Sequence, residues 1–309
     1  ASADALVDGG NDIISVTDIR TDVLTGDVAF MSAGTAVGGN DTITFNGTDG
    51  VTIVGDIHSF TGGTLTPGAD RIKGGSGNDT IFGESSTPSF PTTTGTTVEA
   101  GGGDIIDGRD GNDIILGQVG ADIITGGRGN DVLNGGSGND TVSFASLDLP
   151  VYVDLAGISG SVAAGGGLAE ALGQGIDDIL NCENVTGTSR RDTIKGDGNA
   201  NIFSGGDTAD ILNGRGGNDT LIGGNGADRL VGGVGNDTFR FVAPTDTGIS
   251  IATADLIIGF ASGDKIDLSA IDANPASAVE AFTFVANFTG AGQVAVSQSG
   301  GNTIVSANT

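Results

Sequence analysis

Several residue types that serve catalysis, metal binding by sulfur or nitrogen, and membrane insertion are nearly missing from this chain. Its 309 residues include one cysteine, one histidine, one tyrosine, one methionine and no tryptophan. The lone Cys182 cannot form a disulfide within the chain, and His58 alone cannot complete the His-Glu-x-x-His motif of zinc proteases. No apolar run approaches the ~20 residues of a membrane helix, and no secretory leader is visible. We expect no zinc site and no transmembrane segment.

Positive charge is also scarce. Twelve lysines and arginines face 39 aspartates and glutamates, which gives a net charge of -27. Such acidity argues against nucleic acid as a partner, and against an anionic membrane surface unless a divalent cation bridges the two.

Recognisable catalytic motifs are absent as well. No serine stands in a Gly-x-Ser-x-Gly elbow, and no glycine-rich turn ends in Gly-Lys-Ser/Thr. Paired acids such as Asp177-Asp178 could serve glycoside chemistry, but acids are so abundant that their proximity carries little information. The sequence predicts a protein that is not an enzyme.

Glycine and aspartate are abundant, and they recur with a period of nine residues. Each unit has a turn such as Gly108-Arg109-Asp110-Gly111-Asn112-Asp113, and an apolar pair such as Ile114-Ile115 follows it. A nine-residue unit cannot bury its own apolar side chain, so units must stack into a solenoid. We predict an all-β fold, a parallel β-roll with two units, or eighteen residues, in each coil.

Stacking places aspartates of successive coils about 4.8 Å apart. Asp104, Asp122 and Asp140 would form one ladder, and Asp113 and Asp131 another on the opposite edge. Adjacent carboxylates would repel by roughly 3 kcal/mol at an effective dielectric of 20, unless cations lie between them. Oxygen ligands in flexible turns favour Ca²⁺ over Mg²⁺ and other metals. The ladders therefore predict several calcium ions.

These turns resemble the RTX (hemolysin-type) calcium-binding family, whose nonapeptide reads Gly-Gly-x-Gly-x-Asp-x-(large apolar)-x. The resemblance implies that each ion takes carboxylates and turn carbonyls from two successive coils; for the Asp210/Asp228 ion the carbonyls would be those of Gly206, Thr208, Gly223 and Asn225. The candidate side-chain ligands are Asp12, Asp41, Asp70, Asp79, Asp104, Asp113, Asp122, Asp131, Asp140, Asp192, Asn201, Asp210, Asp219, Asp228 and Asp237. The candidate turn glycines are Gly102, Gly111, Gly117, Gly120, Gly126, Gly135, Gly206, Gly214, Gly217, Gly223 and Gly232.

The turns are not all equivalent. Asn201 is neutral, so the ion that it shares with Asp219 should bind more weakly. In the N-terminal third, Asp12, Asp41 and Asp70 are 29 residues apart, which predicts coils with an enlarged loop on one edge. These loops stack as tolerated insertions or as a recognition surface.

We expect five regions along one chain. Residues 1–99 form N-terminal coils with enlarged loops, residues 100–144 a regular roll, residues 145–191 an interruption, residues 192–241 a second regular roll, and residues 242–309 a C-terminal cap. The segment from Gly165 to Gly175 fits a short helix or a loop. The cap resembles that of serralysin-type proteins, in which an apolar tail with a type I export signal follows; here the chain ends at Thr309, so no export signal is assigned.

Three functions remain open. The first is a secreted, extracellular protein that folds on Ca²⁺ and acts as a structural or adhesive component of a cell surface, matrix, surface layer or filament, with self-association or a surface polysaccharide as partner. The second is the C-terminal calcium-binding module of a larger secreted hydrolase. The third, ice or polysaccharide binding by a flat face, needs an outward threonine or aromatic array, and Lys73, Leu116, Thr125, Asn134 and Ser143 form none. The family resemblance points to a Gram-negative bacterium.

Overall fold

The structure is a computed structural model in which every described element is a β-strand. The described residues are 6–8, 11–16, 23–25, 35–37, 39–48, 50–56, 63–66, 68–83, 96–98, 102–156, 160–164, 175–246, 254–271, 283–285, 293–299 and 302–308. His58 and most of the segment from Gly165 to Gly175 lie outside them. No described helix is long and apolar enough to cross a membrane.

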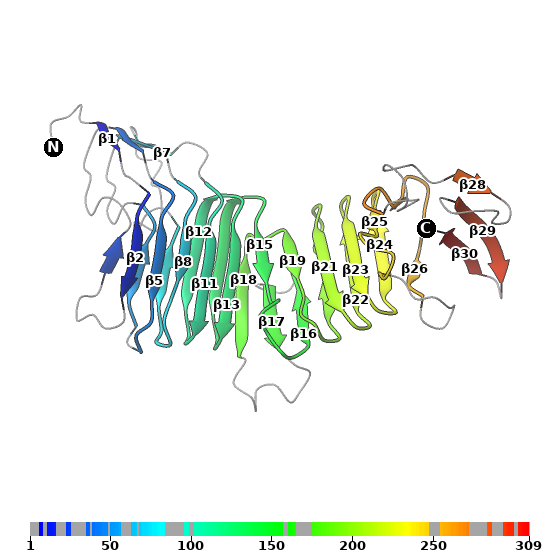
Figure 1. Ribbon diagram of the computed structural model, residues 1–309, viewed down its shortest axis with the longest axis horizontal. Coiled ribbons are helices and arrows are strands. Elements are labelled where there is room, and N and C mark those ends of the chain that lie inside the picture. The colour runs from blue at the N-terminus through cyan, green and yellow to red at the C-terminus, as the bar shows by residue number, and fades with distance from the viewer. Residues whose placement is uncertain are drawn as a thin grey trace.

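Two long parallel sheets face each other and form a roll (Figure 1). Sheet 1 contains, in spatial order, β2 (Ile13–Val16), β5 (Thr42–Phe45), β8 (Arg71–Lys73), β11 (Ile105–Asp110), β13 (Ile123–Arg128), β15 (Thr141–Ser143), β19 (Asn184–Thr186), β21 (Ile202–Asp207), β23 (Thr220–Asn225), β25 (Thr238–Arg240) and β27 (Lys265–Asp267). Sheet 2 contains β3 (Val23–Thr25), β6 (Thr52–Val54), β9 (Thr80–Phe82), β12 (Ile114–Gly120), β14 (Val132–Gly138), β18 (Ile176–Leu180), β17 (Gly160–Ala164), β16 (Val151–Asp154), β20 (Thr193–Lys195), β22 (Ile211–Gly216), β24 (Arg229–Val234) and β26 (Leu256–Ile258). The predicted β-roll is confirmed.

Pairing within the regular roll follows the eighteen-residue coil. Ile105 pairs with Ile123, and Ile114 pairs with Val132. In the N-terminal coils Thr42 pairs with Arg71 at the predicted 29-residue step. The enlarged loops also stack, because β1 (Leu6–Asp8), β4 (Thr35–Val37), β7 (Gly63–Thr66) and β10 (Thr96–Val98) form a third parallel sheet.

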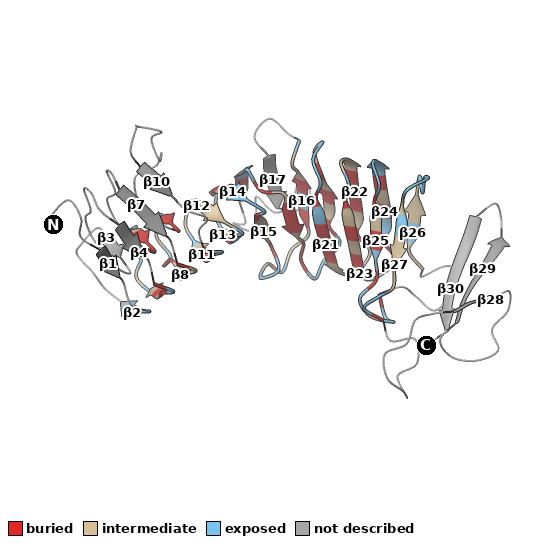
Figure 2. Ribbon diagram, turned by 90° about the horizontal axis from the view of Figure 1, so that it is seen from above, coloured by how far each residue is buried: buried red, intermediate tan, exposed pale blue. Residues whose placement is uncertain are grey.

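The core is one line of apolar side chains between the two sheets. In Figure 2 the buried residues form bands across the strands of the roll. Only the second residue of each apolar pair enters it: Ile115 is fully buried, whereas Ile114 is 45% exposed. The two residues of a pair differ because successive strand residues point to opposite faces. Each nine-residue unit thus contributes a single fully buried apolar side chain, worth about 1.5–3 kcal/mol.

The interruption is an antiparallel excursion within sheet 2. After β15 the chain enters β16 beside β20, turns back through β17, and reaches β18 beside β14. Sheet 1 meanwhile passes directly from β15 to β19. The roll is therefore continuous across residues 145–191.

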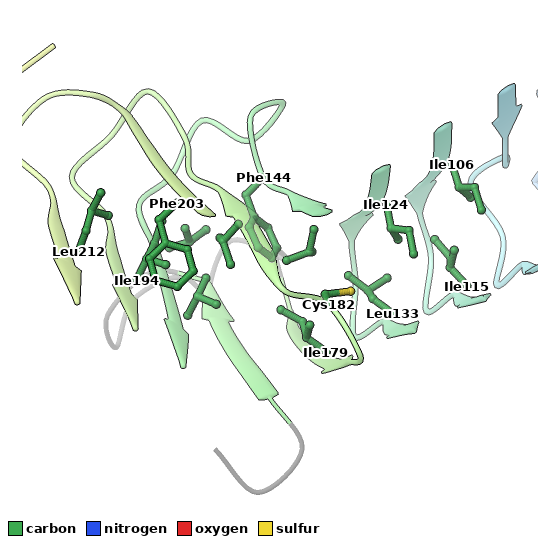
Figure 3. Packing of buried hydrophobic residues seen from close by; sticks show 14 of the residues in the cluster. Ile106, Ile115, Ile124, Leu133, Phe144, Ile179, Cys182, Ile194, Phe203 and Leu212 are labelled. Atoms are coloured by element: carbon green, nitrogen blue, oxygen red, sulfur yellow. The ribbon is translucent and has the colours of Figure 1, made fainter. Parts of the chain in front are cut away.

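Cys182 lies in this interruption and is free. It is buried next to Leu133 and Ile179 (Figure 3). Burial raises the pKa of its thiol to about 12, which keeps the thiol protonated and makes it a packing residue.

The roll continues past residue 241, where a cap was expected to begin. β26 pairs with β24 and β27 pairs with β25, both in parallel. β28 (Thr283–Val285), β29 (Gln293–Ser299) and β30 (Asn302–Asn308) form a separate sheet.

Candidate metal centres

Two ladders of acidic side chains follow the two edges of the roll. The first ladder comprises the residues immediately before the strands of sheet 1: Asp12, Asp41, Asp70, Asp104, Asp122, Asp140, Glu183, Asn201, Asp219, Asp237 and Asp264. The second ladder comprises Asp177, the second residue of β18, and the residues immediately before other strands of sheet 2: Asp79, Asp113, Asp131, Asp192, Asp210, Asp228 and Asp255. Each ladder thus brings acids of different coils into register.

One carboxylate oxygen of each rung holds the neighbouring coil. The backbone N–H of Asp104 donates to Oδ1 of Asp122 at 2.8 Å, and that of Asp122 donates to Oδ1 of Asp140 at 2.9 Å. The same bond joins Asp113 to Asp131 and Asp210 to Asp228. The aspartate is therefore part of the sheet hydrogen bonding as well as a ligand candidate.

The second oxygen is available to a cation in nine rungs. Oδ2 is buried and accepts no hydrogen bond in Asp104, Asp113, Asp122, Asp131, Asp140, Asp210, Asp219, Asp228 and Asp237. These side chains are at most 1% exposed. A buried carboxylate oxygen without a partner is costly, and a bound cation removes that cost. These nine Oδ2 atoms fit a hard metal ion.

Turn carbonyls complete the oxygen environment. A Cβ atom added to Gly108 would meet Oδ2 of Asp113 and, at 2.7 Å, the carbonyl oxygen of Gly126 in the next coil. Gly205 meets Oδ2 of Asp210 and the carbonyl of Gly223 in the same way. For all eleven candidate turn glycines, the carbonyl oxygen lies against a glycine of an adjacent coil. Carboxylate and carbonyl oxygens from two coils are the donor set that Ca²⁺ prefers.

Three predicted ligands differ from these nine, because their own turn caps the second oxygen of Asp79 and of Asp192 and the only side-chain oxygen of Asn201. The N–H of Gly75 donates to Oδ2 of Asp79 at 2.8 Å, and that of Thr188 donates to Oδ2 of Asp192 at 2.6 Å. Likewise, the N–H of Asp197 donates to Oδ1 of Asn201.

Each of the three capped residues stands at the start of a run of ladder residues along an edge. In the coil before it, the corresponding position is Val51 for Asp79, Val151 for Asp192 and Glu183 for Asn201. The capping N–H belongs to the residue four positions before the aspartate. In the uncapped turns this residue takes a left-handed φ, for example +79° at Arg109 and +111° at Gly206, whereas Gly75 and Thr188 do not. A side-chain oxygen that already accepts a backbone N–H is a weaker metal ligand. The nonapeptide pattern alone does not show which turns make this hydrogen bond.

Without bound cations, the ladder aspartates resist full ionisation. The largest cause of their raised pKa is burial, which raises the pKa of Asp113 and of Asp122 to about 7. Burial also raises the pKa of Asp210 to about 8 and that of Asp219 and Asp228 to about 6. Neighbouring carboxylates add to the effect, as Asp140 does for Asp122. The ladders therefore bind either protons or metal ions.

The structure adds ladder members within the interruption that the nine-residue period missed. The N–H of Asp131 donates to Oδ1 of Asp177 at 3.0 Å, and that of Asp140 donates to Oε2 of Glu183 at 2.9 Å. Glu183 stands immediately before β19, which is the signal for it, whereas Asp177 lies within β18. The excursion separates each pair by more than 40 residues. Asp178 is exposed on the opposite face from buried Asp177, so these two acids do not form a catalytic pair.

A third carboxylate joins the first ladder in the N-terminal coils. Asp41, Asp56 and Asp70 each place an oxygen within 4.8 Å of the others, and all three are buried. Asp56 follows Gly55 where the regular turn has a second glycine. The repeat of Gly26-Asp27 and Gly55-Asp56 at 29 residues was the signal for it.

An arginine supplies positive charge at the end of the interruption. Both Nη atoms of Arg215 donate to the carboxylate of Asp154, at 2.6 and 2.7 Å, and Nη1 also donates to the carbonyl of Gly196. Gly196 begins the capped turn of Asn201. A side-chain cation thus binds a turn carbonyl in a coil whose ladder residue is neutral.

A comparison with protein families identifies the repeats. The RTX calcium-binding nonapeptide repeat family, whose model spans four copies, matches residues 65–87, 100–133, 107–142, 183–207 and 204–239. These are RTX calcium-binding repeats. RTX repeats bind multiple Ca²⁺ ions, and proteins that carry them are typically secreted by Gram-negative bacteria.

The RTX match agrees with the geometry. All nine aspartates with a partnerless Oδ2 lie inside the matched segments, whereas Asp12, Asp41 and Asp56 lie outside them. The match names no catalytic activity. A search of curated proteins found no match to the chain.

Proposed function

We propose that this chain is a secreted RTX protein that folds on binding Ca²⁺ outside the cell and then acts as a structural or adhesive component of a surface, matrix or filament. The observation that carries the proposal is the set of nine buried aspartates whose second oxygen has no protein partner. Extracellular calcium modules bind at ~0.1–1 mM. Ladder repulsion keeps the chain unfolded at cytosolic calcium, and calcium outside the cell drives folding.

The proposed ligands are graded by the geometry. The nine aspartates with a partnerless Oδ2, together with carbonyls of the candidate turn glycines, hold the strongest ions. Asp79, Asp192 and Asn201 contribute more weakly because their turns cap them. Asp12, Asp41 and Asp70 serve the enlarged coils, with Asp56 as an additional ligand in that region.

The structural or adhesive role is supported by the shape of the roll and its outer faces. The two sheets run through eleven and twelve strands, so calcium would stiffen one long rod. On sheet 1 a shallow hollow of about 330 Å³ is lined by side chains that include Ile123, Thr141, Thr186, Ile202 and Ser204. Hydroxyls beside aliphatic side chains suit a surface polysaccharide or a second copy of the chain.

Negative-stain electron microscopy of the purified chain, with Ca²⁺ and with EDTA, tests this role. We expect rods in Ca²⁺, joined into filaments or bound to cell-surface polysaccharide, and no rods in EDTA. The alternative is the calcium-binding module of a larger secreted hydrolase. Monodisperse single rods that bind no polysaccharide, from a gene that encodes a catalytic domain upstream, would favour that alternative.

A further inference from the structure

An arginine reaches across the capped turn of Asp79 and joins the coils on either side of it. Arg109 lies near the end of β11, and its Nη1 donates to the carbonyl of Phe45 at 3.2 Å and to Oδ1 of Asn46 at 2.9 Å. The strands β5, β8 and β11 are neighbours in sheet 1 (Figure 1). The capped turn follows β8, so the side chain of Arg109 connects the coil before this turn to the coil after it.

Arg215, in β22, makes the same kind of connection on the other edge of the roll. Its guanidinium donates to the carboxylate of Asp154, at the end of β16, and to the carbonyl of Gly196, all at 2.6–2.7 Å. The strand β20 lies between β16 and β22 and leads into the capped turn of Asn201. The coil before this capped turn is therefore tied to the coil after it.

The third capped turn, that of Asp192, contains its own arginine. Nε of Arg190 donates to the carbonyl of Asp148 at 3.0 Å. Arg190 follows β19 and Asp148 follows β15, and these two strands pair in sheet 1. Among the described residues no other arginine donates to a main-chain carbonyl. Arginine–carbonyl bonds thus coincide with the three turns that begin runs of ladder residues.

Arg109 and Arg215 are held at a conformational cost. Their φ angles are +79° and +68°, in the left-handed region that glycine adopts readily and other residues rarely. Each stands at the second position of its turn, where the nonapeptide has glycine. Glycine would avoid this strain, so the contacts of the guanidinium have to offset it.

A guanidinium can do at these turns what an ion does between regular turns. It is always positively charged, and its fork of N–H donors binds oxygens of two coils at once. It is also part of the chain, so it binds at any calcium concentration. Backbone N–H groups meanwhile occupy a side-chain oxygen of each capped residue, which leaves these turns poorer in metal ligands.

We infer that Arg109, Arg190 and Arg215 take the place of calcium at the first turn of each run of ladder residues, so that folding of each run starts there without an ion. The inference rests on the proposed calcium-dependent folding. In a solenoid each coil contacts only its neighbours, so folding that begins at one place spreads to adjacent coils. An ion-independent start lowers the calcium concentration at which the whole roll folds.

Calcium titrations of Arg109→Gly and Arg215→Gly, followed by far-UV circular dichroism, test the inference. Both substitutions remove an unfavourable φ, so the variants would fold at lower calcium than the wild type if the arginines had no role. We expect the opposite, a midpoint shifted to higher calcium.

The control is Arg128→Gly, in a regular turn, where the arginine has only a 4.0 Å contact with the carboxylate of Asp110. It removes the same charge and adds the same backbone freedom without relieving a left-handed φ. Midpoints of the two test variants at or below that of the control would overturn the inference. A wild-type roll that folds without calcium would instead overturn the proposed function.

Native mass spectrometry separates an arginine that replaces an ion from one that positions calcium ligands. Once folded in excess Ca²⁺, Arg109→Gly and Arg215→Gly should bind at least as many ions as the wild type. A smaller number of bound ions would overturn the inference, because the arginines would then act through calcium sites.

Arg215→Lys decides the case in which Arg215→Gly does not fold at all. Lysine keeps the charge but lacks the planar fork that binds Asp154 and Gly196 together. We expect this variant to fold with a calcium midpoint above that of the wild type. An unchanged midpoint would contradict a role for the guanidinium.

Discussion

The Asp122→Asn variant is expected to be less stable than the wild type in excess Ca²⁺ and more stable than the wild type in EDTA at pH 8. Asp122 lies between Asp104 and Asp140, so its carboxylate serves ions on both sides. Losing one tight ion costs about 2.7 kcal/mol at a free calcium concentration 100 times the Kd. Without calcium, asparagine still accepts the N–H of Asp104 but removes a buried charge. The free energy of unfolding should then rise by roughly 2–4 kcal/mol, since a pKa change of one corresponds to about 1.4 kcal/mol.

Urea unfolding in Ca²⁺, and the size of the β-type circular dichroism signal in EDTA at pH 8, measure this reversal. Asp110→Asn is the matched control, because the side chain of Asp110 is 56% exposed and the substitution removes only a 4.0 Å contact with Arg128. The control should change stability by less than about 0.5 kcal/mol in both conditions. An Asp122→Asn variant that is destabilised equally with and without calcium would show that the aspartate acts only through its hydrogen bond.

Acid is expected to replace calcium. In EDTA the chain should be largely unfolded at pH 8 and should gain β-structure as the pH falls towards 5. Ladder aspartates have a pKa of 3.8 in the unfolded chain and about 6 to 8 in the folded, ion-free roll, as Asp131 and Asp210 illustrate. Between these values folding takes up protons, so stability is highest below the unfolded pKa, falls as the pH rises towards the folded pKa, and levels off above it.

In excess Ca²⁺ the dependence of stability on pH should reverse, so that stability rises with pH, because protons then compete with the ions for the same oxygens. Far-UV circular dichroism across pH 5 to 8, in EDTA and in Ca²⁺, follows both branches. Equal pH profiles in the two solutions would mean that the buried aspartates are neither proton nor metal sites.

The nine-residue period predicts most of the roll because each turn is a local unit. Asp104 to Asp140 and Asp210 to Asp237 stand at a fixed step, so the spacing alone places them in ladders. Capping could not be foreseen in this way. Asp79 follows an ordinary RTX turn, and it is the coil before it, with Val51 on the edge, that distinguishes its rung.

The nine-residue period also could not predict which segments pair after a long insertion between strands. Asp177 and Glu183 enter the ladders only because β16 and β17 double back within sheet 2. Asp255 stands two nine-residue steps after Asp237, but it takes the rung next to Asp228, where the period places Asp246, because the chain between β25 and β26 is longer than a regular turn. In both cases the ladder position is set by strand pairing between distant segments, which composition and spacing do not determine.

A calcium titration at pH 8, followed by far-UV circular dichroism, tests most directly whether ions between the aspartates let the roll fold. We predict little β-type signal in EDTA, a cooperative rise as Ca²⁺ is added, and complete reversal when EDTA is restored. A β-type spectrum that is the same in EDTA and in Ca²⁺ would contradict this account.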